Sequence, residues 1–220
     1  MEQLKKKNEK ALHPSPKSNR GFTLIELLIA MSVGLVLLGA MYGVFTMHNK
    51  IFNNQEQIAE MQQNARAAMD MMTREIRMAG YDPSGTMSPD PQGIPNAKFV
   101  GIPYDADELK IYADLNGDSN ADVAEYDEHE YIKYTIDSDY PFEIRRNTGG
   151  GRQEFALNIQ SFTFEYLNST GSATITTADI RQIRITIIAR TARPDPDYAP
   201  NGGYRTYTLT SIITPRNLGL

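Results

Sequence analysis

An apolar run near the N-terminus constrains this chain more than any other feature. Between Phe22 and Met47 the only charged side chain is that of Glu26. An α-helix needs about 20 residues to cross the hydrocarbon core of a bilayer, so residues 22–47 are long enough to do so. A carboxylate inside such a segment is costly and usually functional, which makes Glu26 a candidate site residue. The alternative is an ordinary membrane anchor that tolerates one acid near its end.

The residues before this run are basic. Residues 1–21 contain six Lys or Arg and two Glu, a net charge of +4. Flanks rich in Lys and Arg stay in the cytoplasm, so the C-terminal part is expected on the outer side of the membrane. Taking +4 from the formal −5 of the whole chain leaves −9 for residues 22–220. A chain this acidic does not favour a general nucleic-acid-binding surface.

The junction Gly21-Phe22-Thr23-Leu24-Ile25-Glu26 resembles a type IV prepilin signal. The resemblance implies that residues 1–21 are a leader peptide and that prepilin peptidase cleaves after Gly21. Phe22 would then be the N-methylated first residue of the mature chain. Glu26 would pair with the terminal amine of a neighbouring subunit during assembly. An unpaired carboxylate in lipid is costly, and an ammonium partner would offset that cost.

Beyond Met47 the sequence becomes amphipathic. Apolar residues recur at spacings of three, four or seven, which is typical of one face of a helix. They are Ile51, Ile58, Met61, Ala65, Ala68, Met72, Ile76 and Ala79. Gly80 is a plausible C-cap. We therefore expect one helix over residues 22–79, whose second half, within residues 48–80, packs on a soluble head.

Residues 81–220 are expected to form a β-rich periplasmic or extracellular head. Segments rich in β-branched and aromatic residues predict strands. They are Glu108–Ala113, Glu130–Ile136, Phe142–Arg145, Ile159–Leu167, Ile180–Ala189 and Tyr204–Ile213. Turns are expected at residues 147–151 and 168–171, and a polar loop at 193–203. The predicted fold class is α+β and type IV pilin-like: a long N-terminal α-helix packed on an antiparallel β-sheet head.

One acidic loop has the oxygen spacing of a calcium site. Its candidate ligands are Asp114, Asn116, Asp118, Asn120, Asp122 and Glu125. Ca²⁺ takes six to eight oxygen ligands, and an EF-hand loop supplies them at this alternation. Ser119 stands where EF-hands need glycine, and the flanks are strand-like rather than helical. The chain has no cysteine, so a structural Ca²⁺ would replace disulfides. The alternative is an Asx-rich turn with solvated charges.

The sequence contains no convincing catalytic constellation. The histidines His13, His48 and His129 fall in leader, stalk and head, where they cannot form one zinc site. His129 lies among Asp127, Glu128 and Glu130, a pattern that favours a solvated acidic surface over a catalytic base. The arginines of the head could form one basic patch, but separate charges on the strand surface are the preferred interpretation. These arginines are Arg145, Arg146, Arg181, Arg184, Arg190 and Arg193. We therefore predict no enzyme and no small-molecule substrate.

Further segments resemble the PilW-type minor pilins. They are Arg77–Tyr81, Ala156–Ile159, Ala178–Arg181 and the terminal Arg216-Asn217. The resemblance implies a non-catalytic role in type IV pilus assembly, in an initiating or tip complex, with links to adhesion and motility. Expected partners are other minor pilins, the major pilin, prepilin peptidase and the inner-membrane assembly platform. Two alternatives stay open: a J-type minor pseudopilin of type II secretion, and a membrane-anchored periplasmic binding or enzymatic domain.

Overall fold

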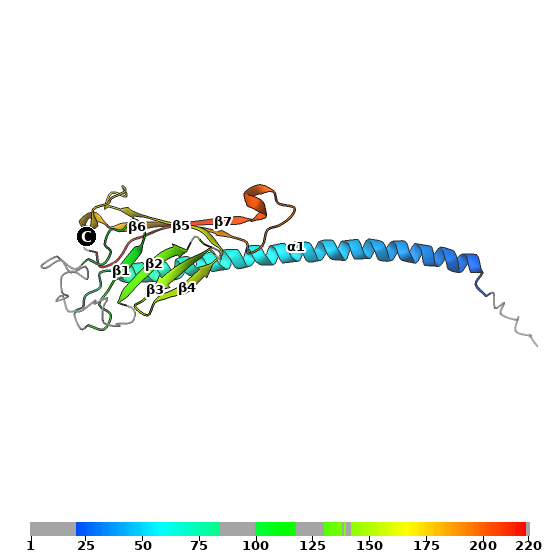
Figure 1. Ribbon diagram of the computed structural model, residues 1–220, viewed down its shortest axis with the longest axis horizontal. Helices are drawn as coiled ribbons and strands as arrows, with labels where there is room; N and C mark the ends of the chain where they lie inside the picture. Colours follow the sequence, from blue (N-terminus) through cyan, green and yellow to red (C-terminus); the bar gives the residue numbers. More distant parts are fainter. Residues whose placement is uncertain (1–20, 84–99, 118–129, 138, 140–141, 219–220) are drawn as a thin grey trace, which may run out of the picture. The chain divides into compact units, whose positions relative to one another are not determined.

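The computed structural model describes residues 21–83, 100–117, 130–137, 139 and 142–218 (Figure 1). The chain divides into two units, residues 1–50 and 51–220. A single helix, α1 (Leu24–Met78), contributes residues to both units. The predicted helix over residues 22–79 is therefore confirmed, with ends shifted by one or two residues.

In the first unit the described residues are almost entirely helical and exposed. An 18-residue window of α1 near the N-terminus has a mean hydropathy of 2.4 and no buried residue. Leu35 and Val36 are 68% and 72% exposed, values typical of this stretch. By length and composition the helix can cross a membrane. Within residues 21–50, the described part of this unit, no residue covers these apolar side chains.

The described residues of the second unit form seven strands in two antiparallel sheets, where the sequence predicted a head with one antiparallel β-sheet. The first sheet has the order β1-β2-β3-β4, and the second has the order β5-β6-β7. The strands are β1 (Leu109–Tyr112), β2 (Tyr131–Asp137), β3 (Glu143–Asn147), β4 (Arg152–Leu157), β5 (Ile159–Leu167), β6 (Gln182–Arg190) and β7 (Thr206–Ile213). Strand β4 was not predicted, because its first three residues are polar and exposed.

The turns follow the sequence prediction. Asn147 Oδ1 accepts the N–H groups of Gly149 and Gly151 at 2.9 and 3.2 Å, between β3 and β4. Both glycines have positive φ, at 101° and 105°, which glycine adopts without steric cost. After β5, the N–H of Gly171 donates to the carbonyl of Asn168 at 3.0 Å. The hairpin turn at 147–151 and the turn at 168–171 are confirmed.

One core joins the second half of α1 to the inner faces of both sheets. On the helix it contains Met61, Ala65, Ala68, Met72 and Ile76. Strand β6 alternates regularly between buried and half-buried residues, as the isoleucine spacing predicted. Ile51 departs from the predicted face, because it is 43% exposed at the first position of this unit.

The end of α1 is held by a close contact between two glycines. Gly80 has φ +74° and donates its N–H to the carbonyl of Tyr112 at 2.9 Å, which confirms it as the C-cap. Gly101 lies so close that a Cβ there would stand 2.1 Å from the nitrogen of Gly80. The N–H of Tyr112 in turn donates to the carbonyl of Gly101 at 2.8 Å. The helix end and strand β1 are thereby joined through backbone alone.

Candidate functional site

The helix begins with a capping box at the predicted assembly residue. Thr23 precedes the first helical residue, and its N–H and hydroxyl both donate to Glu26 Oε2 at 2.8 Å. The Thr23 hydroxyl also accepts the N–H of Glu26 at 3.3 Å. This reciprocal pattern satisfies N–H groups that a helix N-terminus otherwise leaves unpaired. The role of Thr23 was not predicted, although the pattern Thr-x-x-Glu is a known signature of such a cap.

Only one oxygen of Glu26 takes part in that cap. Both donors from Thr23 reach Oε2, and no described residue donates to Oε1. The carboxylate is exposed beside the apolar side chains of Leu24 and Ile25, which are 81% and 66% exposed. Oε1 is therefore an acceptor without a donor among the described residues. Gly21 and Phe22 precede the helix in exposed, non-helical positions.

A second carboxylate of α1 is buried in the head. Glu75 is 6% exposed and accepts the Arg146 guanidinium, with Nη2 at 2.7 Å from Oε1 and Nε at 3.1 Å from the same atom. The Tyr134 hydroxyl donates to the other oxygen, Oε2. Burial, together with the negative charge of Glu75, raises the pKa of Tyr134. The preferred prediction placed Arg146 among separate charges on the strand surface. The structure instead makes Arg146 the partner of a core carboxylate.

The other head arginines do not form a common basic patch. Arg145 pairs with Glu143 and with Asp137, and Arg184 pairs with Glu165. Arg190 lies over the rings of Phe142 and Tyr204, 4.0 and 4.3 Å from their centroids. Arg181 donates to the carbonyls of Ala178 and Ile180 at 2.9 and 2.8 Å. Each of these four guanidinium groups is held by its own local partner, which agrees with the preferred interpretation of separate charges.

The polar loop between β6 and β7 is attached to α1. Asp195 is 5% exposed, and its Oδ2 accepts Nδ2 of Asn54 at 3.0 Å and Nη2 of Arg205 at 2.9 Å. The backbone N–H of Asp197, followed by Arg205, holds the pKa of Asp195 below its usual value. The N–H of Arg193 donates to Oε1 of Gln57 at 2.9 Å. These contacts make the loop part of the folded head.

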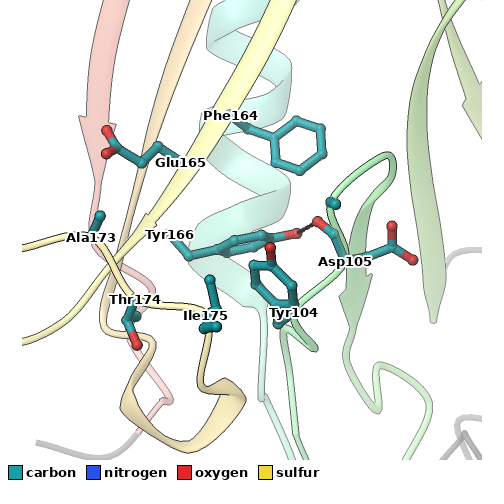
Figure 2. Close-up of a pocket in the computed structure, with 9 residues that line it drawn as sticks. Tyr104, Asp105, Phe164, Glu165, Tyr166, Ala173, Thr174 and Ile175 are labelled. Carbon is teal, nitrogen blue, oxygen red and sulfur yellow. Dashed lines mark hydrogen bonds between the residues drawn. The ribbon is translucent and has the colours of Figure 1, made fainter.

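A pocket of about 350 Å³ lies between β5 and the segment that precedes β1 (Figure 2). Its aromatic wall is formed by Tyr104, Phe164 and Tyr166, with ring centroids 5.4 to 5.7 Å apart. The hydroxyl of Tyr166 donates to the carbonyl of Asp105 at 3.1 Å. Glu165 is already paired with Arg184. The pocket therefore offers aromatic surface but no carboxylate poised as an acid or base.

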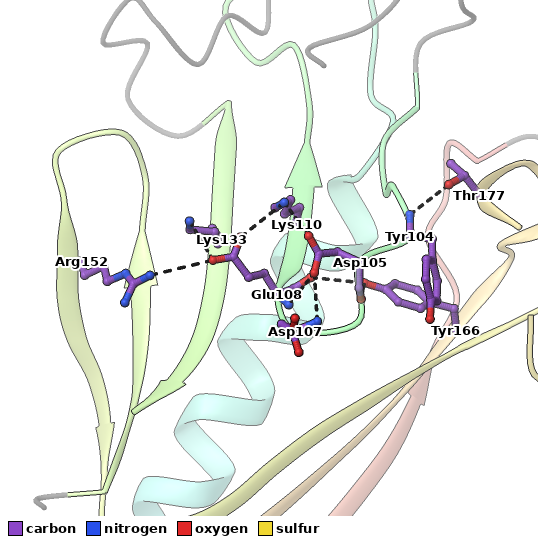
Figure 3. A network of polar contacts seen from close by, with 9 residues as sticks. All are labelled: Tyr104, Asp105, Asp107, Glu108, Lys110, Lys133, Arg152, Tyr166 and Thr177. Atoms are coloured by element: carbon purple, nitrogen blue, oxygen red, sulfur yellow. Dashed lines mark hydrogen bonds and ion pairs between the residues drawn. The ribbon is translucent and has the colours of Figure 1, made fainter. Parts of the chain in front are cut away.

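An ion-pair network fixes the segment beside this pocket (Figure 3). Asp105 Oδ1 accepts the N–H groups of Asp107 and Glu108, and Oδ2 accepts Lys110 Nζ at 2.6 Å. Burial alone would raise the pKa of Asp105, but Lys110 and the two N–H donors outweigh it and the pKa is lowered. Glu108 also pairs with Lys133 at 3.0 Å. All these groups satisfy one another, so the network anchors a loop and leaves no reactive group.

The predicted calcium loop lies only partly within the described residues. Asp114 is buried, and its Oδ1 accepts the N–H of Gly117 at 2.6 Å. Glu130, 3% exposed, accepts the N–H groups of Leu115 and Asn116 at 2.8 and 2.9 Å. The interpretation of Glu130 as part of a solvated acidic surface is therefore wrong, because it holds the start of this loop.

The remaining ligand candidates, Asp118, Asn120, Asp122 and Glu125, lie outside the described residues, as do His13 and His129. Among the residues that the structure does describe, no group of three or more His, Cys, Asp or Glu side chains could hold a metal ion. The calcium site therefore stays a prediction. His48 is exposed on α1 in the first unit.

Comparisons with known proteins agree with this description of the N-terminal segment and define a type IV pilin-like protein. Residues 16–42 match the description "Prokaryotic N-terminal methylation motif". The chain belongs to the family of prepilin peptidase-dependent protein B, which matches residues 54–213. Proteins of this class are typically structural rather than catalytic.

Two individual proteins show more limited similarity. Over 61 residues the chain is 34% identical to "Pilin-like protein PilA3" of Thermus thermophilus, a match that covers 28% of this chain and 26% of the relative. The chain thus spans about a quarter of that relative's length. A solved structure, "Type IV-like pilin TTHA1219 from Thermus thermophilus", has a TM-score of 0.40 and 11% identity, and the match covers 72% of this chain and 98% of that one.

Proposed function

We propose that this protein is a minor pilin of the PilW type that takes part in assembling a type IV pilus, in its initiating or tip complex. Prepilin peptidase cleaves after Gly21, and Phe22 becomes the N-methylated first residue. Residues 22–47 then hold the chain in the inner membrane, with the head on the periplasmic side. Its partners are other minor pilins, the major pilin and the inner-membrane assembly platform. The role is mechanical, through packing of apolar helices.

The arrangement around Glu26 carries this proposal. One carboxylate stands on a helix whose other side chains, as far as Met47, are uncharged and mostly exposed. Thr23 uses only Oε2. A cationic donor from a neighbouring chain can therefore approach Oε1 without breaking the cap. In a medium of low polarity such a charge pair is attractive where an unpaired carboxylate is costly. The methionine and leucine surface around it supplies the contact area.

The first experiment is intact-mass measurement of the chain recovered from native membranes or sheared filaments. We expect a mature chain that begins at N-methylated Phe22. Glu26→Gln should be cleaved normally but should enter filaments at least tenfold less than wild type. Glu60→Gln is the matched control, because Glu60 is exposed on the same helix within the head unit. A chain that keeps residues 1–21 in cells with active peptidase would contradict the proposal.

We also propose a structural Ca²⁺ ion in the acidic loop. The oxygen spacing from Asp114 to Glu125 supports it, as does the need to stabilise a head without disulfides. Ligand binding to the folded state alone raises the melting temperature as the ligand concentration increases. Melting curves of the full chain with Ca²⁺, Mg²⁺ or chelator provide the measurement. Equal melting temperatures in all three conditions would favour the Asx-rich turn instead.

A further inference from the structure

The two sheets of the head end in four edge strands, and three of these edges are closed to further pairing. Strand β1 has only four residues and carries Lys110. Its backbone is engaged on the outer side, where the N–H of Tyr112 donates to Gly101 and its carbonyl accepts Gly80. Short, charged or covered edges are the usual protection against unwanted strand pairing. Edge β1 has all three features.

Edges β4 and β5 are protected in other ways. Strand β4 carries exposed charges at Arg152 and Glu154, and its pairing with β3 is interrupted by an irregularity next to Arg145. Strand β5 carries Glu165, and its outer backbone is partly used, because the carbonyl of Tyr166 accepts the N–H of Thr174 at 2.9 Å. Charges and bulges both prevent a further strand from adding in register.

Strand β7 has none of these protections. Its eight residues, Thr206–Ile213, include no charged residue and no proline. They pair with β6 in unbroken register from Thr206 to Ile213. Among the described residues, none outside β6 makes a backbone hydrogen bond to this strand. Ile212 is 53% exposed on it. A long, neutral, regular edge is a template for an added strand, and soluble proteins rarely leave one open.

We propose that the outer edge of β7 is a docking site for an extended strand of a different pilin-class subunit, which adds to the second sheet. Backbone hydrogen bonds would supply affinity, and alternate side chains would supply specificity. The outward residues of β7 are threonines and an isoleucine without a charge to pair with, so the complementary partner strand is one rich in β-branched residues. This inference rests on the proposed assembly role and identifies which surface of the head makes the contact.

A second copy of this chain is a poor occupant of the same edge. The other three edges are protected, so two copies could pair only β7 against β7. The symmetric pairing of two identical edges is antiparallel, and it would set the head segments of the two α1 helices in opposite directions. Subunits that enter one membrane through the same N-terminal segment share one polarity. A different subunit with its own open edge can pair with β7 while both helices keep the same direction. A symmetric dimer of this chain cannot.

A matched pair of substitutions tests the edge. Thr163, Thr186 and Thr210 form one row across the second sheet, on β5, β6 and β7. Thr163 and Thr210 are both exposed at the two ends of the row. Thr210→Lys should reduce recovery of the chain in sheared filaments at least tenfold, because a lysine on an edge blocks strand addition. Thr163→Lys adds the same charge to the same face at the protected edge and should have little effect.

Further measurements keep the test decisive. Thr210→Glu should reduce recovery in filaments as Thr210→Lys does, since either charge blocks strand pairing. If β7 instead bound its partner through charge attraction, one of the two substitutions would lower recovery and the other would raise it. Amides of β7 in the wild-type chain should exchange at least tenfold more slowly in filaments than in the detergent-solubilised subunit. Melting of the solubilised variants shows whether they are folded. If Thr210→Lys is unfolded, the exchange measurement alone decides, and unchanged β7 exchange overturns the inference.

Two other results would also overturn it. Normal recovery of folded Thr210→Lys in filaments would exclude β7 as a contact. A dimer of the solubilised wild-type chain that Thr210→Lys dissociates would identify a second copy as the occupant. The N-terminal mass of each preparation separates failure of this inference from failure of the proposed function. A chain that begins at Phe22 but makes no β7 contact retains the pilin role and loses only this docking site.

Discussion

The two halves of α1 each carry a carboxylate within an apolar surface, and they treat it differently. Glu75, in the head, has both oxygens engaged by residues of the same chain, Arg146 and Tyr134. Glu26, in the exposed half, has one oxygen capped by Thr23 and receives no donor at the other from any described residue. In the head half of the helix, the buried carboxylate of Glu75 finds all its hydrogen-bond partners within the chain. The first half instead presents exposed apolar surface and one carboxylate oxygen without a donor among the described residues.

The difference shows how one helix can serve two environments. Around Glu75 the side chains of Met72 and Ile76 are fully buried against the sheets. Around Glu26 the apolar side chains are exposed, and no described residue of their unit packs on them. Burial of apolar surface contributes to head stability in the first case. In the second case the same kind of surface remains available to lipid or to neighbouring helices.

The largest expected effect comes from breaking the buried pair. Arg146→Met leaves Glu75 charged and without its cation, and removing one partner of a buried ion pair costs about 3–5 kcal/mol. The free energy of unfolding of the head, measured for the full chain in detergent, should fall by about this amount. Adding Glu75→Gln to Arg146→Met removes the uncompensated charge and keeps an acceptor for the Tyr134 hydroxyl.

That double variant should recover most of the lost stability. Equal stability of the single and double variants would show that the uncompensated charge of Glu75 does not cause the loss of stability in Arg146→Met. In the other half of the helix, Glu26→Gln should leave head unfolding unchanged while it reduces entry into filaments. A loss of head stability in Glu26→Gln would contradict the separation of the two halves.

Much of the fold could be predicted from the sequence because the signals are local. The period of apolar residues and Gly80 located the helix, and β-branched runs located six of the seven strands. Strand β4 was missed because an edge strand with exposed Arg152 and Glu154 has little apolar alternation. The contact of Gly101 with Gly80 has no local signal either, since only the folded backbone brings the two glycines together.

The candidate site divides in the same way. Gly21, Phe22 and Glu26 lie within six residues of one another in the sequence, so a short motif was sufficient to select them. Thr23 could have been found from the capping-box spacing. The partnership of Glu75 with Arg146 joins residues 71 positions apart, and its charges resemble ordinary surface residues in the sequence. A pair that depends on tertiary packing has no signature that a single sequence can reveal.

A smaller contrast is expected from truncating one apolar side chain in each half. Met72→Ala removes a fully buried side chain, and such a change typically costs about 2–5 kcal/mol. Leu35→Ala is the matched substitution in the first half, where Leu35 is 68% exposed, and it should leave the head unfolding free energy within about 0.5 kcal/mol of wild type. Denaturant titration of both full-length variants gives the comparison. Similar losses in both would show that the first half also supports the head.

The smallest effect concerns the helix start. Thr23→Ala removes the hydroxyl that exchanges hydrogen bonds with Glu26 and keeps the backbone N–H that donates to Oε2. Loss of such a capping hydroxyl costs about 1 kcal/mol. Amides of the first helical turn should therefore exchange about five times faster in micelles, while head amides remain unchanged. Thr46→Ala is the control, because Thr46 only donates to the carbonyl of Gly43 within the same helix. Thr23→Ser should retain wild-type exchange, since serine keeps the hydroxyl. If Thr23→Ala instead leaves exchange of the first turn unchanged, the Thr23 hydroxyl does not stabilise the helix start, and the backbone N–H that donates to Glu26 Oε2 is sufficient as a cap.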